Sequence, residues 1–273
     1  MQEKIAFIGG GNMARAIVLG LINSGVAAAR IVISEPAAER RRELARELPG
    51  VTVTSSNGDA AADADTLLLA VKPQVLRDVC RELEATVVER KPLVVSIAAG
   101  IGSADIEAWL GGALAVVRVM PNQPALLGLG VSGMVGNASA TGEQLARAER
   151  IMAAAGKVVR VADEAQIDAV TAVSGSGPAY FFLLIDMLAK SGEKLGLDAD
   201  TSLTLALETA RGSAALALDA NEDMAELINR VRSPGGTTAA ALDILSASDV
   251  RGIFERALIA ARDRAAELAA ERT

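Results

Sequence analysis

The chain has 273 residues, a net charge of −7 and only 2% aromatic residues. This length suggests one large or two medium domains, and the acidic balance argues against a nucleic-acid partner, which requires a basic face. The chain contains no histidine and one cysteine, Cys80, which excludes Ser-His-Asp and Cys-His catalysis and argues against a zinc site. We therefore expect no metal, and chemistry that a cofactor supplies.

Strand-like and helix-like segments alternate up to residue 163. Short apolar runs predict strands buried between helices, and Thr141-x-x-Gln144 is a capping box that begins a helix ending near Ala155. This alternation predicts an α/β fold, a Rossmann-like doubly wound and mostly parallel sheet in residues 1–163. The predicted strands are residues 5–8, 30–34, 51–54, 66–71, 93–97, 114–119 and 157–161.

Only helical patterns remain after residue 163, so residues 164–273 are predicted to be an all-α domain. Pro178 suits the first position of a helix that runs to about Gly196. The apolar faces are too extensive for a monomer, which predicts dimerisation through these helices. The further predicted helices are 200–219, 223–231, 237–246 and 249–270.

Two features predict a cytoplasmic protein that does not cross a membrane. The longest uncharged stretch, Ala169 to Ile185, is interrupted by Ser-Gly-Ser-Gly-Pro, so we expect no membrane span there. The chain runs from Met1 almost directly into a strand, so we expect no signal peptide.

A glycine-rich turn, Gly9-Gly10-Gly11-Asn12-Met13-Ala14, follows the first predicted strand and begins a helix. Gly9 permits the tight turn, Gly11 lets a pyrophosphate approach the backbone, and Ala14 lets the helix pack close to the strand. The spacing predicts a dinucleotide site; the alternative is an ordinary tight turn between a strand and a helix.

The end of the second predicted strand bears on the choice between NAD and NADP. It reads Ser34-Glu35-Pro36, with Arg40, Arg41 and Arg42 beyond. An acidic residue here bonds the ribose hydroxyls and repels a 2′-phosphate. Ser34 and an arginine provide for that phosphate, whereas the arginines also suit a solvated helix face. We expect NADP(H), with NAD(H) as a second possibility.

Two further strand ends reach the edge where such sheets bind ligands. Ala70-Val71-Lys72-Pro73 ends one strand, and Lys72 either faces the cofactor or merely precedes the proline that stops the strand. Asn122 lies in a rigid loop between two prolines, where it is well placed to contact a nicotinamide or substrate.

A second glycine-rich turn, Ser233-Pro-Gly-Gly-Thr-Thr238, leads directly into a helix. Such a turn presents backbone N–H groups and a positive dipole end to an anion. Ser174-Gly-Ser-Gly-Pro-Ala-Tyr180 precedes the first long helix of the second domain and is either a site segment or a structural turn.

Taken in order, these motifs resemble pyrroline-5-carboxylate reductase along the whole chain. They are GGGNMA at 9–14, AVKP at 70–73, SIAAGI at 96–101, MPN-x-PA at 120–125, AVSGSGPAY at 172–180, EKLGL at 193–197 and SPGGTT at 233–238. Two residues depart from the family's usual pattern: Gln123 stands where a threonine is frequent, and Arg232 where a small hydroxyl residue is common.

The resemblance implies reduction of the C=N bond of 1-pyrroline-5-carboxylate by hydride from NAD(P)H, giving L-proline as the last step of proline biosynthesis. It implies that Thr238 contacts the ring nitrogen. We place the substrate carboxylate on the N–H groups of Gly235, Gly236 and Thr237, with Ser233 and Ser176 also in the substrate site. The implied cofactor-binding residues are Ile8, Gly9, Gly10, Gly11, Asn12, Met13, Ser34, Glu35, Asn57, Ala70, Val71, Lys72, Pro73, Ala98 and Asn122.

Two other functions remain open from the sequence. A β-hydroxyacid dehydrogenase-like enzyme shares the first turn and a helical second domain, and would use Lys190 or Lys194 as its acid–base group. A non-enzymatic NAD(P)-binding dimer needs only the first turn. Neither explains the SPGGTT segment.

Overall fold

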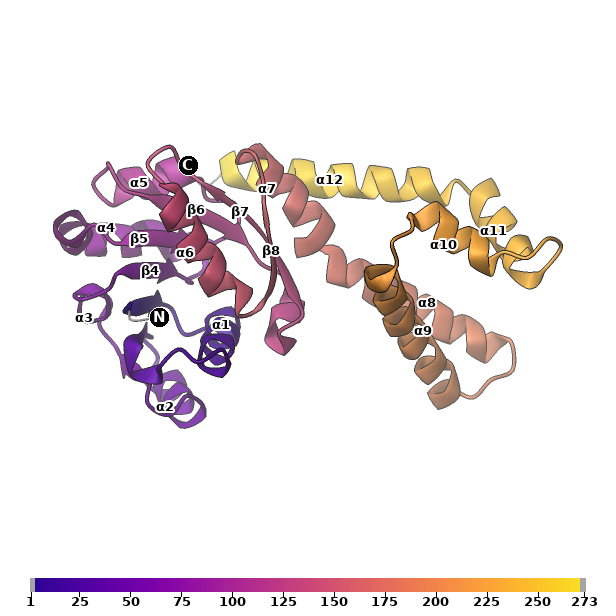
Figure 1. The fold of residues 1–273 in the computed structure, drawn as a ribbon, viewed down its shortest axis with the longest axis horizontal. Helices are drawn as coiled ribbons and strands as arrows, with labels where there is room; N and C mark the ends of the chain where they lie inside the picture. The colour runs from indigo at the N-terminus through magenta and orange to yellow at the C-terminus, as the bar shows by residue number, and fades with distance from the viewer. Residues whose placement is uncertain (1–2, 271–273) are drawn as a thin grey trace. The chain divides into compact units, whose positions relative to one another are not determined.

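The computed structural model describes residues 3–270, which form two compact units. The first unit comprises the chain up to Ser176 together with the end of the last helix from Ala261, and the second is Gly177–Ala260. The first is a sheet flanked by helices and the second contains helices alone (Figure 1). The change of sequence pattern near residue 163 precedes this division, because the helix that follows it packs on the sheet.

The first unit contains an eight-stranded sheet with the order β3-β2-β1-β4-β5-β6-β7-β8. All neighbouring strands are parallel except β6 and β7, and β8 is parallel to β7. This arrangement confirms the predicted doubly wound, mostly parallel sheet. The strands are β1 Ile5–Ile8, β2 Ile31–Ser34, β3 Thr52–Thr54, β4 Thr66–Leu69, β5 Leu93–Ser96, β6 Val116–Met120, β7 Gly130–Gly136 and β8 Gly156–Arg160.

Helices cover both faces of the sheet because alternate strand residues point to opposite sides. On one face, Phe7 and Ile33 pack with α1, α2 and α6; on the other, Ile8 and Leu67 pack with α3, α4 and α5 around the buried Cys80. Burial raises the pKa of the Cys80 thiol to about 12, so this cysteine is a core residue. The helices are α1 Asn12–Asn23, α2 Ala38–Glu47, α3 Asn57–Ala61, α4 Pro73–Arg90, α5 Ser103–Trp109 and α6 Gly142–Ala153.

The predicted capping box is confirmed. The Thr141 hydroxyl accepts the N–H of Gln144, and the Gln144 side chain accepts the N–H of Thr141. Strand β7 was not predicted. Its sequence, GVSGMVG, has the glycine content of a loop, but it pairs with both β6 and β8.

The second unit leaves much of its apolar surface exposed. Among its large apolar residues Leu218 is 89% exposed, Ile244 70% and Phe181 63%. A helical unit with so much exposed apolar surface requires a partner surface, in agreement with the oligomer expected from the sequence. Its helices are α8 Gly177–Lys194, α9 Ala199–Asp219, α10 Met224–Val231, α11 Thr237–Ala247 and α12 Val250–Ala270, the last of which extends into the first unit.

The Ser-Gly-Ser-Gly-Pro segment does not interrupt the helix, contrary to the expectation from sequence. Helix α7, Ala165–Val170, continues through a π-helical turn, Thr171–Gly175, into α8. The resulting 30-residue helix is long and apolar enough to cross a membrane by length and composition alone. Only 17% of its most apolar window is buried, and one such helix is weak evidence for a membrane span, because a core helix of a soluble protein passes the same test.

Candidate functional site

A cleft of about 320 Å³ lies at the carboxyl edge of the sheet, where β1, β4, β5 and β6 end. Ligands bind at this edge in open α/β sheets. It brings together the glycine-rich turn and the AVKP segment, as predicted, with residues that the prediction did not include. The lining residues are Gly11, Asn12, Met13, Ala14, Ala70, Val71, Lys72, Ile97, Ala99, Met120 and Pro121.

The glycines of the first turn are required for different structural reasons. Gly9 has a φ of +101°, and a Cβ there would lie 2.7 Å from the carbonyl oxygen of Ala70. A Cβ on Gly11 would meet nothing within 4 Å, so this residue lies beside open space. Gly11 is also the N-cap of α1, and no side chain caps its first turn in the described structure. The helix therefore presents uncapped amides to the cleft.

Glu35 is bound to the glycine-rich turn itself. Its Oε2 accepts the N–H of Gly10 at 3.1 Å and its Oε1 accepts the N–H of Ala37 at 3.0 Å. The Nε of Arg40 donates to the carbonyl of Gly10 at 3.0 Å. A carboxylate and a guanidinium therefore both lie at the turn, and the amide of Gly10 is already donated to a side chain.

Ser34 and Asn57, both predicted to bind the cofactor, contact each other. The Ser34 hydroxyl is fully buried and donates to Oδ1 of Asn57 at 2.6 Å, and Asn57 donates to Glu82 at 2.9 Å. The idea that Ser34 holds a 2′-phosphate does not fit, because its hydroxyl is inside the fold. Asn57 is the partly exposed member of the pair.

Asn122 and Ala98 are buried rather than on the cleft surface. Asn122 is 8% exposed, and its Oδ1 accepts the N–H of Val131 at 2.9 Å, which fixes the connection from β6 to β7. The predicted contact with a nicotinamide is not supported by this arrangement. Ala98 is 6% exposed, Ile8 is within β1, and Pro73 begins α4.

The π-helical turn lies beside the cleft. A Cβ on Gly175 would lie 2.6 Å from the methyl group of Met120, which lines the cleft. Ser176, the predicted substrate residue, ends the turn with its N–H donated to the carbonyl of Thr171 at 2.8 Å. The AVSGSGPAY segment is thus helical and not a loop; its residues up to Ser176 belong to the first unit and those from Gly177 to the second.

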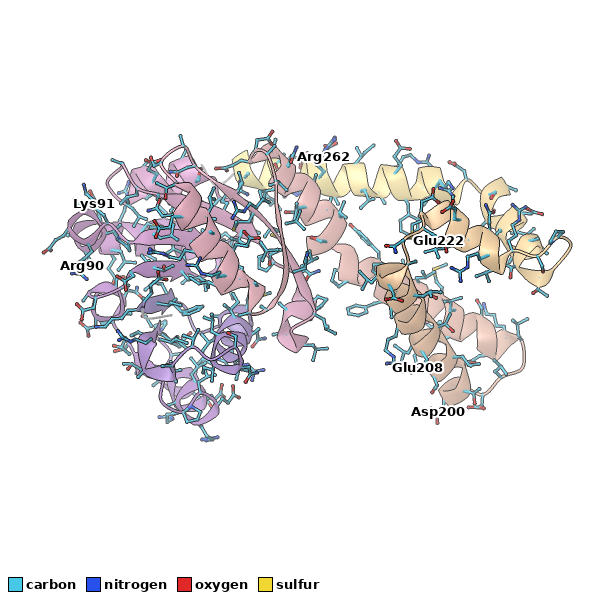
Figure 2. All side chains as sticks on the ribbon, viewed as in Figure 1. Arg90, Lys91, Asp200, Glu208, Glu222 and Arg262 are labelled. Carbon is cyan, nitrogen blue, oxygen red and sulfur yellow. The ribbon has the colours of Figure 1, made fainter. Side chains whose placement is uncertain are left out.

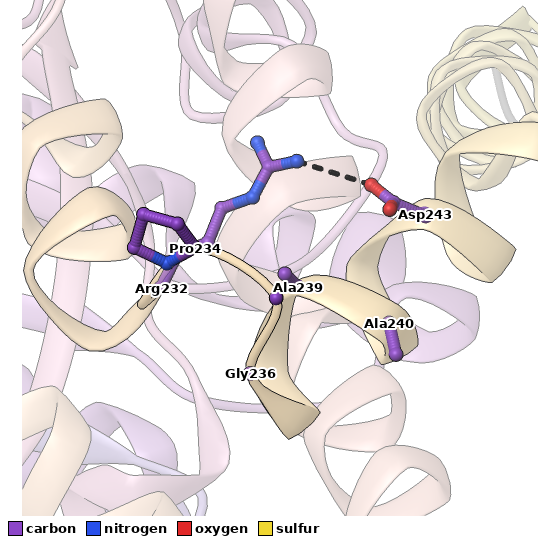
Figure 3. A pocket seen from close by; sticks show the side chains of 7 residues that line it. Arg232, Pro234, Gly236, Ala239, Ala240 and Asp243 are labelled. Atoms are coloured by element: carbon purple, nitrogen blue, oxygen red, sulfur yellow. Dashed lines mark hydrogen bonds and ion pairs between the residues drawn. The ribbon is translucent and has the colours of Figure 1, made fainter.

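The second glycine-rich turn joins α10 to α11 in the second unit (Figure 3). Gly235 has a φ of +71°, and Gly236 is the N-cap of α11. The N–H of Gly236, which the sequence predicted to bind the carboxylate, donates to the carbonyl of Ser233 at 3.0 Å in this structure. The uncapped amides are those of the first helical turn, Thr237, Thr238 and Ala239.

Thr238 lies in an apolar groove of about 320 Å³ between α9, α10 and α11. It is a different cavity from the one beside Gly235 and Gly236, which measures about 480 Å³ and includes Arg232 and Asp243. The groove walls are Ser213, Leu216, Ala217, Met224, Leu227, Ile228, Val231, Thr238 and Leu242. Thr238 thus joins an apolar surface to the uncapped amides of α11.

Several site residues lay outside the prediction. The cleft is also lined by Ile97, Ala99, Met120 and Pro121. The available signal for these residues was their place in the SIAAGI and MPN-x-PA motifs. In the sequence, Arg40 was only a charged residue on a predicted helix, and no nearby residue indicated that its side chain contacts Gly10. Within residues 3–270, no three side chains of Cys, Asp or Glu gather as a metal site would require.

The parallel sheet, the glycine-rich turn and the cleft at its carboxyl edge define a dinucleotide-binding oxidoreductase. Residues 4–100 match the family described as NADP oxidoreductase, coenzyme F420-dependent, and residues 164–268 match pyrroline-5-carboxylate reductase dimerisation. A pyrroline-5-carboxylate reductase from Pseudomonas aeruginosa is 50% identical over 97% of both chains. The chain belongs to the pyrroline-5-carboxylate reductase family.

Two solved structures extend the similarity to three dimensions. A pyrroline-5-carboxylate reductase from Coxiella burnetii has a TM-score of 0.94 and 41% identity, covering 98% of this chain and 99% of that one. A pyrroline carboxylate reductase from Plasmodium falciparum with NADP bound has a TM-score of 0.85 and 27% identity, with the same coverage.

Proposed function

We propose that this chain reduces 1-pyrroline-5-carboxylate to L-proline with hydride from NADPH, the last step of proline biosynthesis. The observation that carries this proposal is the 50% identity to the Pseudomonas aeruginosa reductase across both units. This chain also contains the SPGGTT turn, which the other two functions leave unexplained. We further propose a cytoplasmic homodimer formed through the helices of residues 164–273.

The cleft of the first unit fits the cofactor. Open space beside Gly11 and the uncapped first turn of α1 suit a pyrophosphate, whose charge the helix dipole stabilises. Lys72 lines the same cleft and adds positive charge. When bound, NADPH supplies the hydride that reduces the C=N bond.

The first turn of α11 fits the carboxylate of the substrate. The amides of Thr237, Thr238 and Ala239 point out of the helix start, where the dipole favours an anion. The apolar groove that Thr238 lines suits the methylene groups of a five-membered ring. The carboxylate and the ring of the substrate are therefore both held at the start of α11.

The site needs little acid–base chemistry, in keeping with a chain that lacks histidine. A protonated cyclic imine is already electrophilic, so positioning it is the main task of the protein. The Thr238 hydroxyl orients the ring nitrogen and relays a proton through water.

Replacing Thr238 by alanine is expected to lower kcat about fivefold to tenfold, the worth of one hydrogen bond. NADPH binding should not change, because the cofactor cleft is built from the first unit. Steady-state kinetics and an NADPH titration measure both quantities. The Thr238→Ser variant keeps the hydroxyl and should recover most of the rate; full activity in Thr238→Ala contradicts this role.

The cofactor preference tests the position of Glu35. Its carboxylate and the Arg40 guanidinium both lie at the turn, so we expect NADPH to be used with appreciable NADH activity. The Glu35→Gln variant should shift the kcat/KM ratio about tenfold toward NADPH, because a charge that repels the 2′-phosphate is removed. A wild-type preference for NADPH above roughly a thousandfold contradicts this interpretation, since a partly exposed carboxylate at the turn would repel the 2′-phosphate.

One assay separates the three candidate functions: the loss of NADPH absorbance with pyrroline-5-carboxylate as substrate. Lys190, one of the two lysines available to the dehydrogenase alternative, forms an exposed ion pair with Asp186 at 2.8 Å. That bond raises the pKa of Lys190, whereas a catalytic lysine requires a lowered one. Absence of imine-dependent NADPH loss overturns the proposal.

A further inference from the structure

Arg232 spans the second glycine-rich turn. It follows Val231 at the end of α10, where its N–H donates to the carbonyls of Ile228 and Asn229. Its Nη2 lies 3.1 Å from Oδ1 of Asp243, two turns into α11 (Figure 3). The ion pair therefore ties the end of one helix to the body of the next, across the loop between them.

The loop has few other restraints. Residues 232–235 are exposed, and a Cβ on Gly235 would meet nothing within 4 Å. Its single internal backbone hydrogen bond among the described contacts joins Gly236 to Ser233. Glycine-containing loops have high conformational entropy, which is lost when a ligand fixes them. A link that restricts the loop beforehand reduces this cost and strengthens binding.

The ion pair lies on the other side of α11 from Thr238. Asp243 follows Thr238 by five residues, which places the two about 140° apart around the helix. They also line different cavities: Asp243 and Arg232 line one and Thr238 the other. Arg232 therefore lies away from the Thr238 side of α11, although its cavity also includes Ala239 at the start of that helix. Its guanidinium is engaged by Asp243, and we infer that it acts through this partner.

We propose that the Arg232–Asp243 ion pair is a clasp that pre-organises the turn of residues 233–236 relative to the start of α11. Because the first amides of α11 hold the imine carboxylate in the proposed function, Arg232 is a positioning residue for that carboxylate. This inference rests on the proposed function. A clasp improves the binding of ground state and transition state equally, so it affects KM and not kcat.

Removing either partner tests the clasp. Arg232→Ser and Asp243→Asn should each raise KM for pyrroline-5-carboxylate about twofold to fivefold, the range for an exposed ion pair. The kcat and the KM for NADPH should stay at wild-type values. The double variant should be no worse than either single variant, because both remove the same interaction, and Arg232→Lys should recover part of the loss.

Asp243→Asn also separates the clasp from a direct role of the guanidinium. If Arg232 bound the substrate itself, freeing it from Asp243 would lower KM, and that result overturns the clasp. The matched control is the pair of Arg230 and Glu222, 3.0 Å apart and similarly exposed, which does not span the turn; Glu222 is labelled in Figure 2.

Arg230→Ser should leave KM for the imine unchanged. An equal rise in the KM for the imine in this control variant indicates a general effect of charge and overturns the clasp. Wild-type activity that persists with unchanged KM in all variants refutes only the clasp, whereas an inactive wild-type protein refutes the proposed function itself. Thermal unfolding of each variant identifies any loss of fold.

Discussion

Replacing Gly11 by alanine is expected to weaken NADPH binding about tenfold to a hundredfold while leaving the fold intact. The new Cβ meets nothing within 4 Å in the protein, so the folded chain is not strained. It occupies the open space at the start of α1 where the pyrophosphate approaches the backbone. Forcing a methyl group into a close contact costs about 1–3 kcal/mol, which corresponds to this loss of affinity. Fluorescence titration with NADPH measures it.

Two other glycines provide the comparison for Gly11. Gly142 begins α6 and also has open space around it, so Gly142→Ala should bind NADPH like the wild type. Gly9→Ala should instead lower the melting temperature, because φ is +101° and Cβ would lie 2.7 Å from a backbone oxygen. Unchanged NADPH affinity in Gly11→Ala means that the pyrophosphate does not lie at this turn.

The parallel strands could be predicted because burial on both faces is visible in a short stretch of sequence. Thr66–Leu69 is buried throughout, and its apolar run showed this. Strand β7 could not be predicted, because its glycines are required by contacts with residues distant in the sequence. A Cβ on Gly133 would lie 2.6 Å from Val170, and one on Gly130 would lie 2.8 Å from Ala125. A local pattern cannot distinguish these glycines from those of a loop.

The candidate site was predictable as segments but not as hydrogen bonds. The two glycine-rich turns were identified from their composition and from the helices that follow them. The hydrogen bonds of individual groups depend on the folded backbone conformation: the N–H of Gly236 goes to Ser233 within the same turn, and the Asn122 side chain to Val131. The sequence therefore predicted an anion site at this turn and included one amide, that of Gly236, that is already donated to Ser233.

An ion pair that involves a buried arginine of the first unit could not be predicted from the sequence, because its members come from separate elements. Arg118 on β6 has a side chain only 7% exposed, and it lies 2.7 Å from Glu164, just before α7. Both the N–H and the hydroxyl of Ser103, at the start of α5, donate to the same carboxylate. Glu164 thus joins three elements of the first unit around a buried cation.

Glu164→Gln is expected to lower the free energy of unfolding by about 2 kcal/mol at pH 7, because Arg118 is left buried without its counter-charge. This value lies below the range for a fully buried pair, since Glu164 is about a third exposed. Burial alone would raise the pKa of Glu164, but the bonds from Ser103 and Arg118 outweigh it and hold that pKa below its ordinary value. Urea unfolding at several pH values measures the effect.

The pH dependence follows from the direction of that shift. A carboxylate with a lowered folded pKa stabilises the fold above its ordinary pKa of 4.5, and this contribution is lost as the pH falls through the folded pKa. The difference between Glu164→Gln and wild type should therefore be complete at pH 7 and shrink below about pH 4. A difference that does not change with pH means that the amide disturbs packing and not charge.

Asp168 is the matched control, because it lies near the same arginine with the opposite shift. Burial raises its pKa, with the charge of Arg118 opposing and that of Glu164 reinforcing the rise. A raised carboxyl pKa means that folding disfavours the charged form, so Asp168→Asn should leave the free energy of unfolding at pH 7 unchanged or slightly higher. If Asp168→Asn destabilises the chain as much as Glu164→Gln, then Arg118 depends on the summed negative charge around it and not on the bond to Glu164.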